Sequence, residues 1–133
     1  MADIRAFIKK WNGRTLQDDG SFVSKEYKSF QTAFINAMKK IAASLGAEVV
    51  NTSKGHYDVS GFIKRGDKCV YFSYDSSLSL KGRTYIVLKG DMDCGCHGAM
   101  LVRSADNEHD YRGHTNNFPA FERCELLIER LLA

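Results

Sequence analysis

The chain of 133 residues is 44% hydrophobic and 26% charged, with 11 glycines and one proline, a composition that excludes disordered, collagen-like and low-complexity classes. Its length predicts a single domain covering residues 1–133, and no apolar run reaches the roughly 20 residues that cross a bilayer. The net charge is +3, but residues 1–90 carry 15 Lys and Arg against 8 acids, whereas residues 91–133 carry 4 against 8.

Two N-terminal helices are predicted from apolar residues at helical spacing. Asp3 is the expected cap of the first and Gly13 its end, and residues 13–24 are predicted to form a loop. Ser24 is the expected N-cap of the second, longer helix, which ends before Gly46. The apolar stripes consist of Ile4, Phe7, Ile8 and Trp11 in the first helix and of Phe30, Phe34, Ala37, Met38, Ile41 and Leu45 in the second.

From Glu48 onward the pattern changes to the two-residue alternation of strands, rich in β-branched and aromatic residues. The tetrapeptide Arg65–Lys68 has the composition of a turn and predicts a hairpin, while the short connections argue against parallel crossovers. The five predicted strands are 48–52, 56–64, 68–75, 84–90 and 98–105.

A C-terminal helix is predicted after Pro119, which suits a first helical turn. Its buried stripe is expected to consist of Phe121, Cys124, Leu127, Ile128 and Leu131. The order of elements indicates an α+β domain: an antiparallel sheet of about five strands, with two N-terminal helices and one C-terminal helix packed mainly on one face.

The stretch DMDCGCHGAM, residues 91–100, raises the question of a metal site. Structural zinc sites use ligand pairs two to four residues apart, whereas the adjacent Cys96 and His97 would point to opposite faces of a strand. We interpret the stretch as a loop running into the fifth strand and expect no metal and no cofactor. Because the N-terminus lacks the long apolar segment of a signal peptide, we expect a cytoplasmic protein with reduced cysteines, of which Cys69 and Cys124 fit the core.

The enzyme alternative is a small metal-assisted hydrolase or nuclease that uses the His- and Asp-rich region 91–116. Asp58 and Asp75 lie on neighbouring strands, but the lysine that such nucleases place two positions after the second acid is absent. Gly-x-Ser-x-Gly and a Gly-Lys-Ser/Thr phosphate loop are also absent. The hydrolase would use His97, His109, Asp110, His114 and either Asp91 or Asp93, and convergence of His56, His114 and Asp93 on a metal also stays open.

Basic and aromatic residues gather around the predicted hairpin. Lys64, Arg65 and Lys68 precede Tyr74, and Arg83 precedes the next predicted strand. Such a mixture can grip phosphates and stack bases. In the alternative interpretation, the charges at the hairpin tip only discourage edge-to-edge pairing of strands. The uneven charge of the chain then belongs to an ordinary solvated surface.

The segment LVRSADNEHDYRGHTNNF, residues 101–118, resembles a group of small uncharacterised proteins carried on phages and integrative conjugative elements of Gram-positive bacteria. The shared pattern is an apolar pair, Arg-Thr/Ser-Ala, a polar stretch, Asp-Tyr-x-Gly and an Asn before an aromatic residue, and the likeness covers about residues 65–125. This chain has His114 where the group often has a second glycine. The matching residues are Arg103, Ser104, Ala105, Asp110, Tyr111, Gly113, Asn116 and Phe118.

The resemblance implies an accessory role in a mobile element, such as DNA transfer or inhibition of host defence. Structurally, Arg103 and Asp110 are expected to form a charge-assisted pair, with Gly113 supplying a left-handed backbone angle and Asn116 capping backbone groups. In the functional alternative, the loop is a binding surface that presents Arg103, Tyr111, His114 and Asn116 together.

We predict a protein that acts by binding, either as an inhibitor of a host defence nuclease, like an anti-CRISPR protein, or as a nucleic-acid-associated module. Its partner would be a host defence protein or its nucleic acid, without a membrane or a small-molecule cofactor. The basic first two-thirds of the chain argues against mimicry of DNA. The predicted binding residues are Lys64, Arg65, Lys68, Tyr74, Arg83, Arg103, Tyr111, His114 and Asn116.

Overall fold

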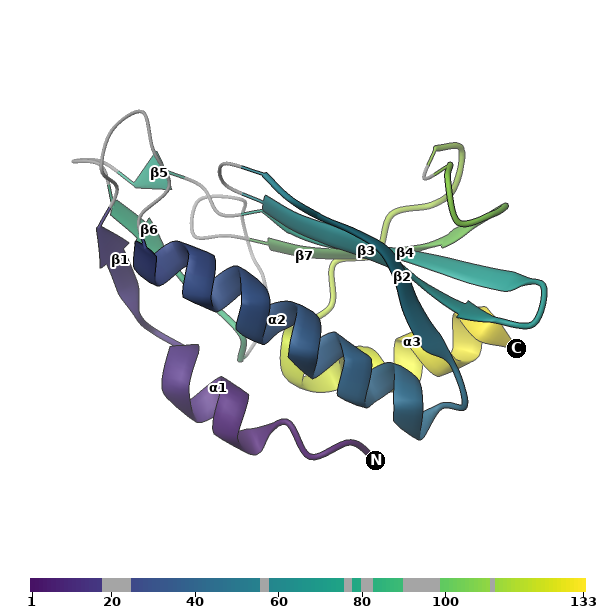
Figure 1. Ribbon diagram of the computed structural model, residues 1–133, viewed down its shortest axis with the longest axis horizontal. Coiled ribbons are helices and arrows are strands. Elements are labelled where there is room, and N and C mark those ends of the chain that lie inside the picture. The colour runs from purple at the N-terminus through teal and green to yellow at the C-terminus, as the bar shows by residue number, and fades with distance from the viewer. Residues whose placement is uncertain (18–24, 56–57, 76–77, 80–82, 90–98, 111) are drawn as a thin grey trace.

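A four-stranded antiparallel sheet with strand order β2-β3-β4-β7 forms one layer of the protein, and helices cover one of its faces (Figure 1). The computed structural model describes residues 1–17, 25–55, 58–75, 78–79, 83–89, 99–110 and 112–133. The predicted α+β class and the hairpin between β3 and β4 are confirmed. The strands span Glu48–Lys54 (β2), Asp58–Arg65 (β3), Lys68–Asp75 (β4) and Ala99–Ala105 (β7).

The three α-helices of the described residues lie on the same side of this sheet (Figure 1). The long helix α2, Lys25–Ser44, packs against β2 and β3, and α3, Cys124–Leu132, packs against β4 and β7. The short helix α1, Arg5–Trp11, packs on α2. A 3-10 turn, η2, Phe121–Arg123, leads into α3, so helical structure begins two residues later than Pro119 predicted.

A second, small sheet corrects the predicted strand arrangement. Its strands are β1, Thr15–Gln17, β5, Leu78–Ser79, and β6, Arg83–Tyr85, in the order β1-β6-β5. Residues 84–90 were predicted as a strand of the main sheet, but Ile86 hydrogen bonds through its backbone to Gly13 and Arg14 instead. Strand β7 pairs with the edge of β4. Residues 83–86 therefore pair with residues 13–17, which lie in the stretch predicted as a loop.

The core lies between the main sheet and the helices. Alternation along β4 directs Val70, Phe72 and Tyr74 toward the helices, where all three are fully buried. Phe34 of α2 lies at the centre of an aromatic cluster whose ring centroids are 5.5–6.2 Å from its own. The rings around Phe34 are Phe7, Phe30, Phe72, Tyr74 and Phe121.

Several predicted ends and turns are confirmed. Positive φ angles of 80°, 67° and 64° occur at Gly13, Gly46 and Gly66, where the first two helices end and the hairpin turns. Cys69 and Cys124 are buried free thiols, as predicted. The expected cap Ser24 and the loop at residues 91–98 lie outside the described residues.

Candidate nucleic-acid interface

Arg103 of β7 joins the outer face of the sheet to the loop that follows. Its guanidinium lies 5.1 Å above the Tyr71 ring, which in turn lies 5.3 Å from the ring of Phe62. Arg103 Nη1 donates to Asn116 Oδ1 at 2.9 Å. Backbone hydrogen bonds in both directions between Val102 and Asn117 then hold the end of the loop against β7. The predicted residues Arg103 and Asn116 are thus brought together, in a contact that fixes the loop.

Asp110 does not pair with Arg103, which corrects that expectation. Its Oδ1 accepts the backbone N–H of Arg112 at 3.0 Å and the Arg112 Nε–H at 3.2 Å, and these contacts hold the pKa of the Asp110 carboxyl below its usual value. Arg112 is only two positions away, so Asp110 can bind it within the turn without reaching back to the sheet. Gly113 has a φ of 91°, so its predicted backbone angle is confirmed.

Charged contacts anchor the rest of the loop. Lys64 Nζ lies 2.6 Å from Glu108 Oε2, and the contact raises the pKa of Lys64 and lowers that of Glu108. His114 Nε2 lies 3.0 Å from Asp106 Oδ1. Asn51, with a φ of 51°, donates from its side chain to the Glu108 carbonyl at 2.7 Å. Lys64 and His114 therefore stabilise the loop through acidic partners.

Arg65 and Tyr74 both have structural contacts, and the burial of Tyr74 corrects its assignment to a binding surface. Arg65 donates to the carbonyls of Leu45 at 3.0 Å and Leu132 at 3.2 Å, so it ties together the C-terminal ends of α2 and α3. The Tyr74 hydroxyl accepts the Val87 N–H at 2.9 Å, and burial raises its pKa to about 12. A ring with no exposed surface cannot stack on a base.

Of the other predicted residues, Lys68 is exposed at the hairpin. The Tyr111 residue and the Arg83 side chain lie outside the described residues. Within the part of the chain that the structure describes, no three His, Cys, Asp or Glu side chains are grouped to hold a metal. His97, Asp91 and Asp93 lie outside that part, so the hydrolase alternative stays a prediction.

Asp58 and Asp75 face each other directly across β3 and β4. Burial, followed by the charge of Asp58, raises the pKa of Asp75. A raised pKa in the folded state favours the protonated acid, so its contribution to stability is present at low pH and is lost as the pH rises through that pKa.

We therefore expect Asp75→Asn to raise the free energy of unfolding at pH 7 by roughly 0.5 kcal/mol, since it removes a like-charge cross-strand pair. The gain should shrink as the pH falls toward the pKa of the acid. Urea denaturation at pH 7 and pH 4.5 measures it. Asp58→Asn should give a smaller gain, because it relieves the repulsion but not the burial of the Asp75 charge, and the double variant should gain no more than Asp75→Asn alone. Full additivity of the two gains would contradict this explanation.

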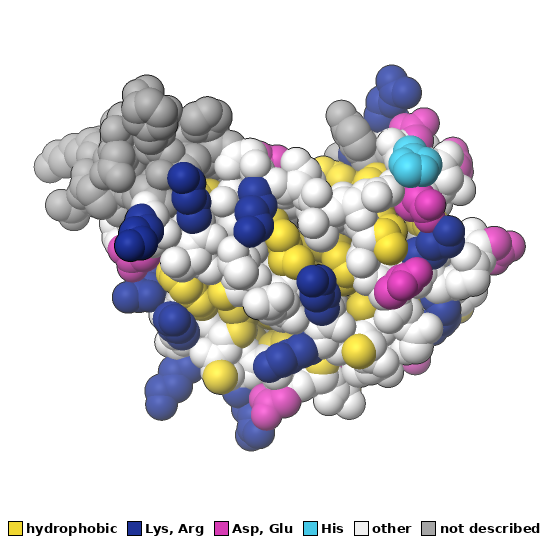
Figure 2. Space-filling view, viewed as in Figure 1, with side chains coloured by type: hydrophobic (Ala, Val, Ile, Leu, Met, Phe, Trp, Pro, Cys, Tyr) yellow, Lys and Arg dark blue, Asp and Glu magenta, His cyan; other side chains and the backbone are white. Residues whose placement is uncertain are grey.

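Among the described residues, a larger group of cations lies on α1 and α2, which together carry seven Lys and Arg residues against one acid, Glu26. Arg5 and Lys9 lie on the side of α1 next to Lys89 and Glu122, and the others lie on the outer side of the two helices. Figure 2 shows Lys and Arg spread over this side, while acidic side chains gather toward the 106–110 loop. All seven cations are exposed. We call this surface the cationic helical face; it consists of Arg5, Lys9, Lys10, Lys25, Lys28, Lys39 and Lys40.

Within this face, Lys25, Lys28 and Lys39 form a stripe along the solvent side of α2. At 100° per residue they fall within a sector of about 60° on the helix, outside the arc that the buried residues occupy. Lys54 extends the stripe from β2, because its Nζ donates to Thr32 Oγ1 at 2.8 Å. The 20 residues of α2 extend over about 30 Å. We call these four lysines the lysine stripe; they form no ion pair with other described residues.

A groove of about 260 Å³ runs between α1 and α2 beside this stripe. Lys10 and Lys40 line it together with one acid, Asp3, and with the Phe7 and Trp11 side chains. The Lys10 ammonium lies 5.3 Å from the centre of the Trp11 ring, whose face stabilises the cation. Cations from both helices thus border one shallow apolar channel.

Sequence reasoning about the hairpin missed this face, although two signals pointed to it. One was the excess of positive charge in the first 90 residues. The other was the spacing of the lysines in the second predicted helix, which repeats on one helical side.

Comparison of the chain with protein-family models, curated proteins and solved structures finds no match. Among the described residues, no helix has the length and apolar character needed to span a membrane.

Proposed function

We propose that this protein is a nucleic-acid-binding accessory protein of the kind that mobile elements carry, and that it binds through the cationic helical face. The observation that supports this proposal is the ratio of seven basic residues to one acid on α1 and α2. Exposed lysines that form no ion pair with other described residues can each neutralise a phosphate and release its counterion.

The lysine stripe favours contact with the sugar-phosphate backbone over reading of bases. Duplex DNA carries a phosphate about every 3.4 Å of helix axis along each strand, so a stripe that runs about 21 Å from Lys25 to Lys39 can contact several phosphates. Lysine presents a point charge without the planar fork that recognises guanine, and the exposed side of α2 carries lysine and no arginine. Binding should therefore depend little on sequence.

Inhibition of a host defence nuclease, which the family resemblance implies, is one form of this proposal. In that form the cationic helical face would contact the guide or target nucleic acid held by the host effector. The general form requires only free nucleic acid and is tested first.

The test is the salt dependence of binding. Fluorescence anisotropy with a labelled 20-nucleotide strand and its duplex, of random sequence, is measured between 50 and 200 mM salt. If four phosphates are neutralised, the logarithm of the binding constant should fall with a slope of about −3 to −4 against the logarithm of salt concentration. A flat response, or no binding of either probe at 50 mM salt, would overturn the proposal.

A further inference from the structure

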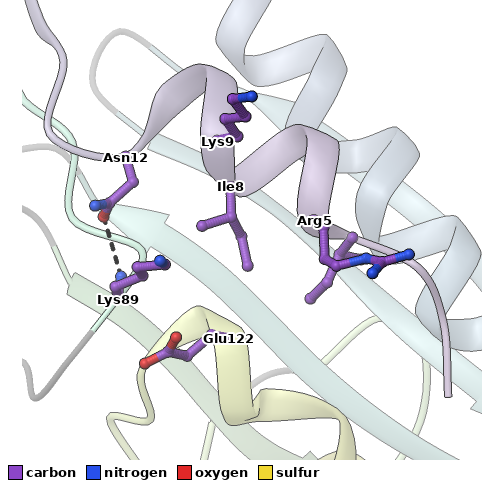
Figure 3. Close-up of a pocket in the computed structure, with 7 residues that line it drawn as sticks. Arg5, Ile8, Lys9, Asn12, Lys89 and Glu122 are labelled. Atoms are coloured by element: carbon purple, nitrogen blue, oxygen red, sulfur yellow. Dashed lines mark hydrogen bonds between the residues drawn. The ribbon is translucent and has the colours of Figure 1, made fainter.

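Two hollows flank helix α1, and they differ in charge. The larger is a cleft of about 610 Å³ between α1 and η2, where Figure 3 shows the Glu122 carboxylate facing Lys89. Arg5 and Lys9 are directed away from this cleft, so one acid and one cation face each other across it. The smaller is the groove of about 260 Å³ between α1 and α2, which both helices line with lysine. Because it lies within the cationic helical face, the groove is the hollow that an anionic chain would meet.

The two sides of the groove come from helices that run in opposite directions (Figure 1). Arg14, just after α1, pairs with Glu26 near the start of α2 at 3.3 Å. Lys10 therefore lies toward one end of the groove and Lys40 toward the other. Along α2 the lining runs from Ala33 to Lys40, which is about 10 Å at 1.5 Å per residue. The groove thus places a cation near each end of a short channel.

The floor of this channel is apolar and includes aromatic rings. Phe7 is partly exposed, and the short side chains of Ala33 and Ala37 on α2 leave room beside it. The Trp11 ring also lines the groove, with the Lys10 ammonium 5.3 Å from its centre. Positively charged grooves that contain aromatic side chains are typical of proteins that bind single-stranded nucleic acids.

The groove is formed without a ligand, because packed rings fix the spacing of the two helices. The Phe7 ring centroid lies 6.1 Å from that of Phe30 and 6.2 Å from that of Phe34. The Trp11 ring lies 5.4 Å from the same Phe30 ring. Binding in the groove therefore requires little ordering of the helices that form it.

We propose that this groove takes up an unpaired base of single-stranded nucleic acid, with phosphates of the strand next to Lys10 and Lys40. The inference deepens the proposed function and rests on it, because the strand must first be held by the cationic helical face. In a duplex the bases are paired and stacked, so the backbone alone reaches the lysines. The exposed amide of Asn36, which also lines the groove, can donate to or accept from the edge of the base.

One acid, Asp3, lines the groove at the end near Lys40. Its carboxylate accepts from Arg5 Nε at 3.1 Å and from Arg5 Nη2 at 3.2 Å. These contacts, and to a smaller extent the charge of Lys40, hold the pKa of Asp3 below its usual value. Because Arg5 balances the charge of Asp3, the surroundings of the groove stay positive.

The experiment compares four probes: a mixed-sequence strand of 20 nucleotides, an abasic strand of the same length, the duplex of the first strand, and polyglutamate of 20 residues. Fluorescence anisotropy at 100 mM salt gives each affinity. The mixed-sequence strand should bind about tenfold more tightly than the abasic strand, since stacking of one base on an aromatic side chain is worth at least this factor. Trp11 is the chain's single tryptophan, so its emission should be quenched by the mixed-sequence strand and little changed by the abasic strand or the duplex.

Ala33→Leu fills the groove with a larger apolar side chain and changes no charge. It should lower the affinity for the mixed-sequence strand to that for the abasic strand and remove the quenching of Trp11. Ala43→Leu is the matched control, because it makes the same substitution at an exposed residue of α2 outside the groove lining. This control should keep both the preference and the quenching, and circular dichroism verifies that both variants fold.

Equal affinity of the unmodified chain for the mixed-sequence and abasic strands, with steep salt dependence for both, would overturn the groove assignment and leave the proposed function standing. A preference that survives in the folded Ala33→Leu variant would do the same. Polyglutamate that binds as tightly as the mixed-sequence strand and quenches Trp11 would make the groove a site for an acidic polypeptide. If no nucleic-acid probe binds even at 50 mM salt, the proposed function fails, and this inference fails with it.

Discussion

Replacing both Lys28 and Lys39 with glutamate should weaken binding to a duplex of random sequence by about tenfold or more at 0.1 M salt. Both side chains lie on the exposed side of α2, so the substitution leaves the buried face of the helix intact. Loss of two phosphate contacts should also reduce the salt slope by about 2. Anisotropy titrations of the unmodified chain and the variant, with circular dichroism to verify the fold, measure both changes.

The matched control is K68E/R130E, which changes the net charge by the same amount at two exposed residues, one at the hairpin and one on α3. It should retain most of the affinity, because neither residue belongs to the cationic helical face. An equal loss in both variants would mean that net charge alone controls binding. A larger loss in the control would place the interface at the hairpin, where sequence reasoning first put it.

Periodicity accounts for the parts of the fold that could be predicted from the sequence. The apolar stripe of α2 and the alternation of β3 and β4 repeat over 20 and 8 residues, so local pattern and burial agree. The same alternation predicts that Tyr74 lies on the buried face of β4, together with Val70 and Phe72. Its assignment to a binding surface used the chemistry of the ring and ignored this strand face, and was therefore wrong.

Arg65 shows why other roles could not be predicted. Its acceptors are the carbonyls of Leu45 and Leu132, which lie 20 and 67 residues away along the chain. Both acceptors are backbone groups at helix ends, so their side chains give no signal of the contact. The partner of Arg103 was missed for a similar reason: Asp110 was expected and Asn116 is found. Which of the two contacts Arg103 depends on how the loop folds back on β7.

Phe34→Ala should lower the free energy of unfolding by about 3–5 kcal/mol, because it removes a large buried ring from the core. The Phe34 ring is fully buried and contacts rings from α1, α2, β4 and η2, so its loss leaves a cavity between both layers. Since domains are stable by only about 5–15 kcal/mol, the variant should unfold at much lower urea concentration. Urea denaturation followed by circular dichroism measures the difference.

Phe118→Ala is the matched control, because it removes the same atoms from a side chain that is 55% exposed. Its free energy of unfolding should change by no more than about 0.5 kcal/mol if the ring makes no buried contact that matters. A large loss at Phe118 would instead indicate that the 106–117 loop and its anchor on β7 stabilise the whole sheet. A small loss at Phe34 would contradict the two-layer core, since Phe34 is a ring of α2 that contacts rings of both β4 and η2.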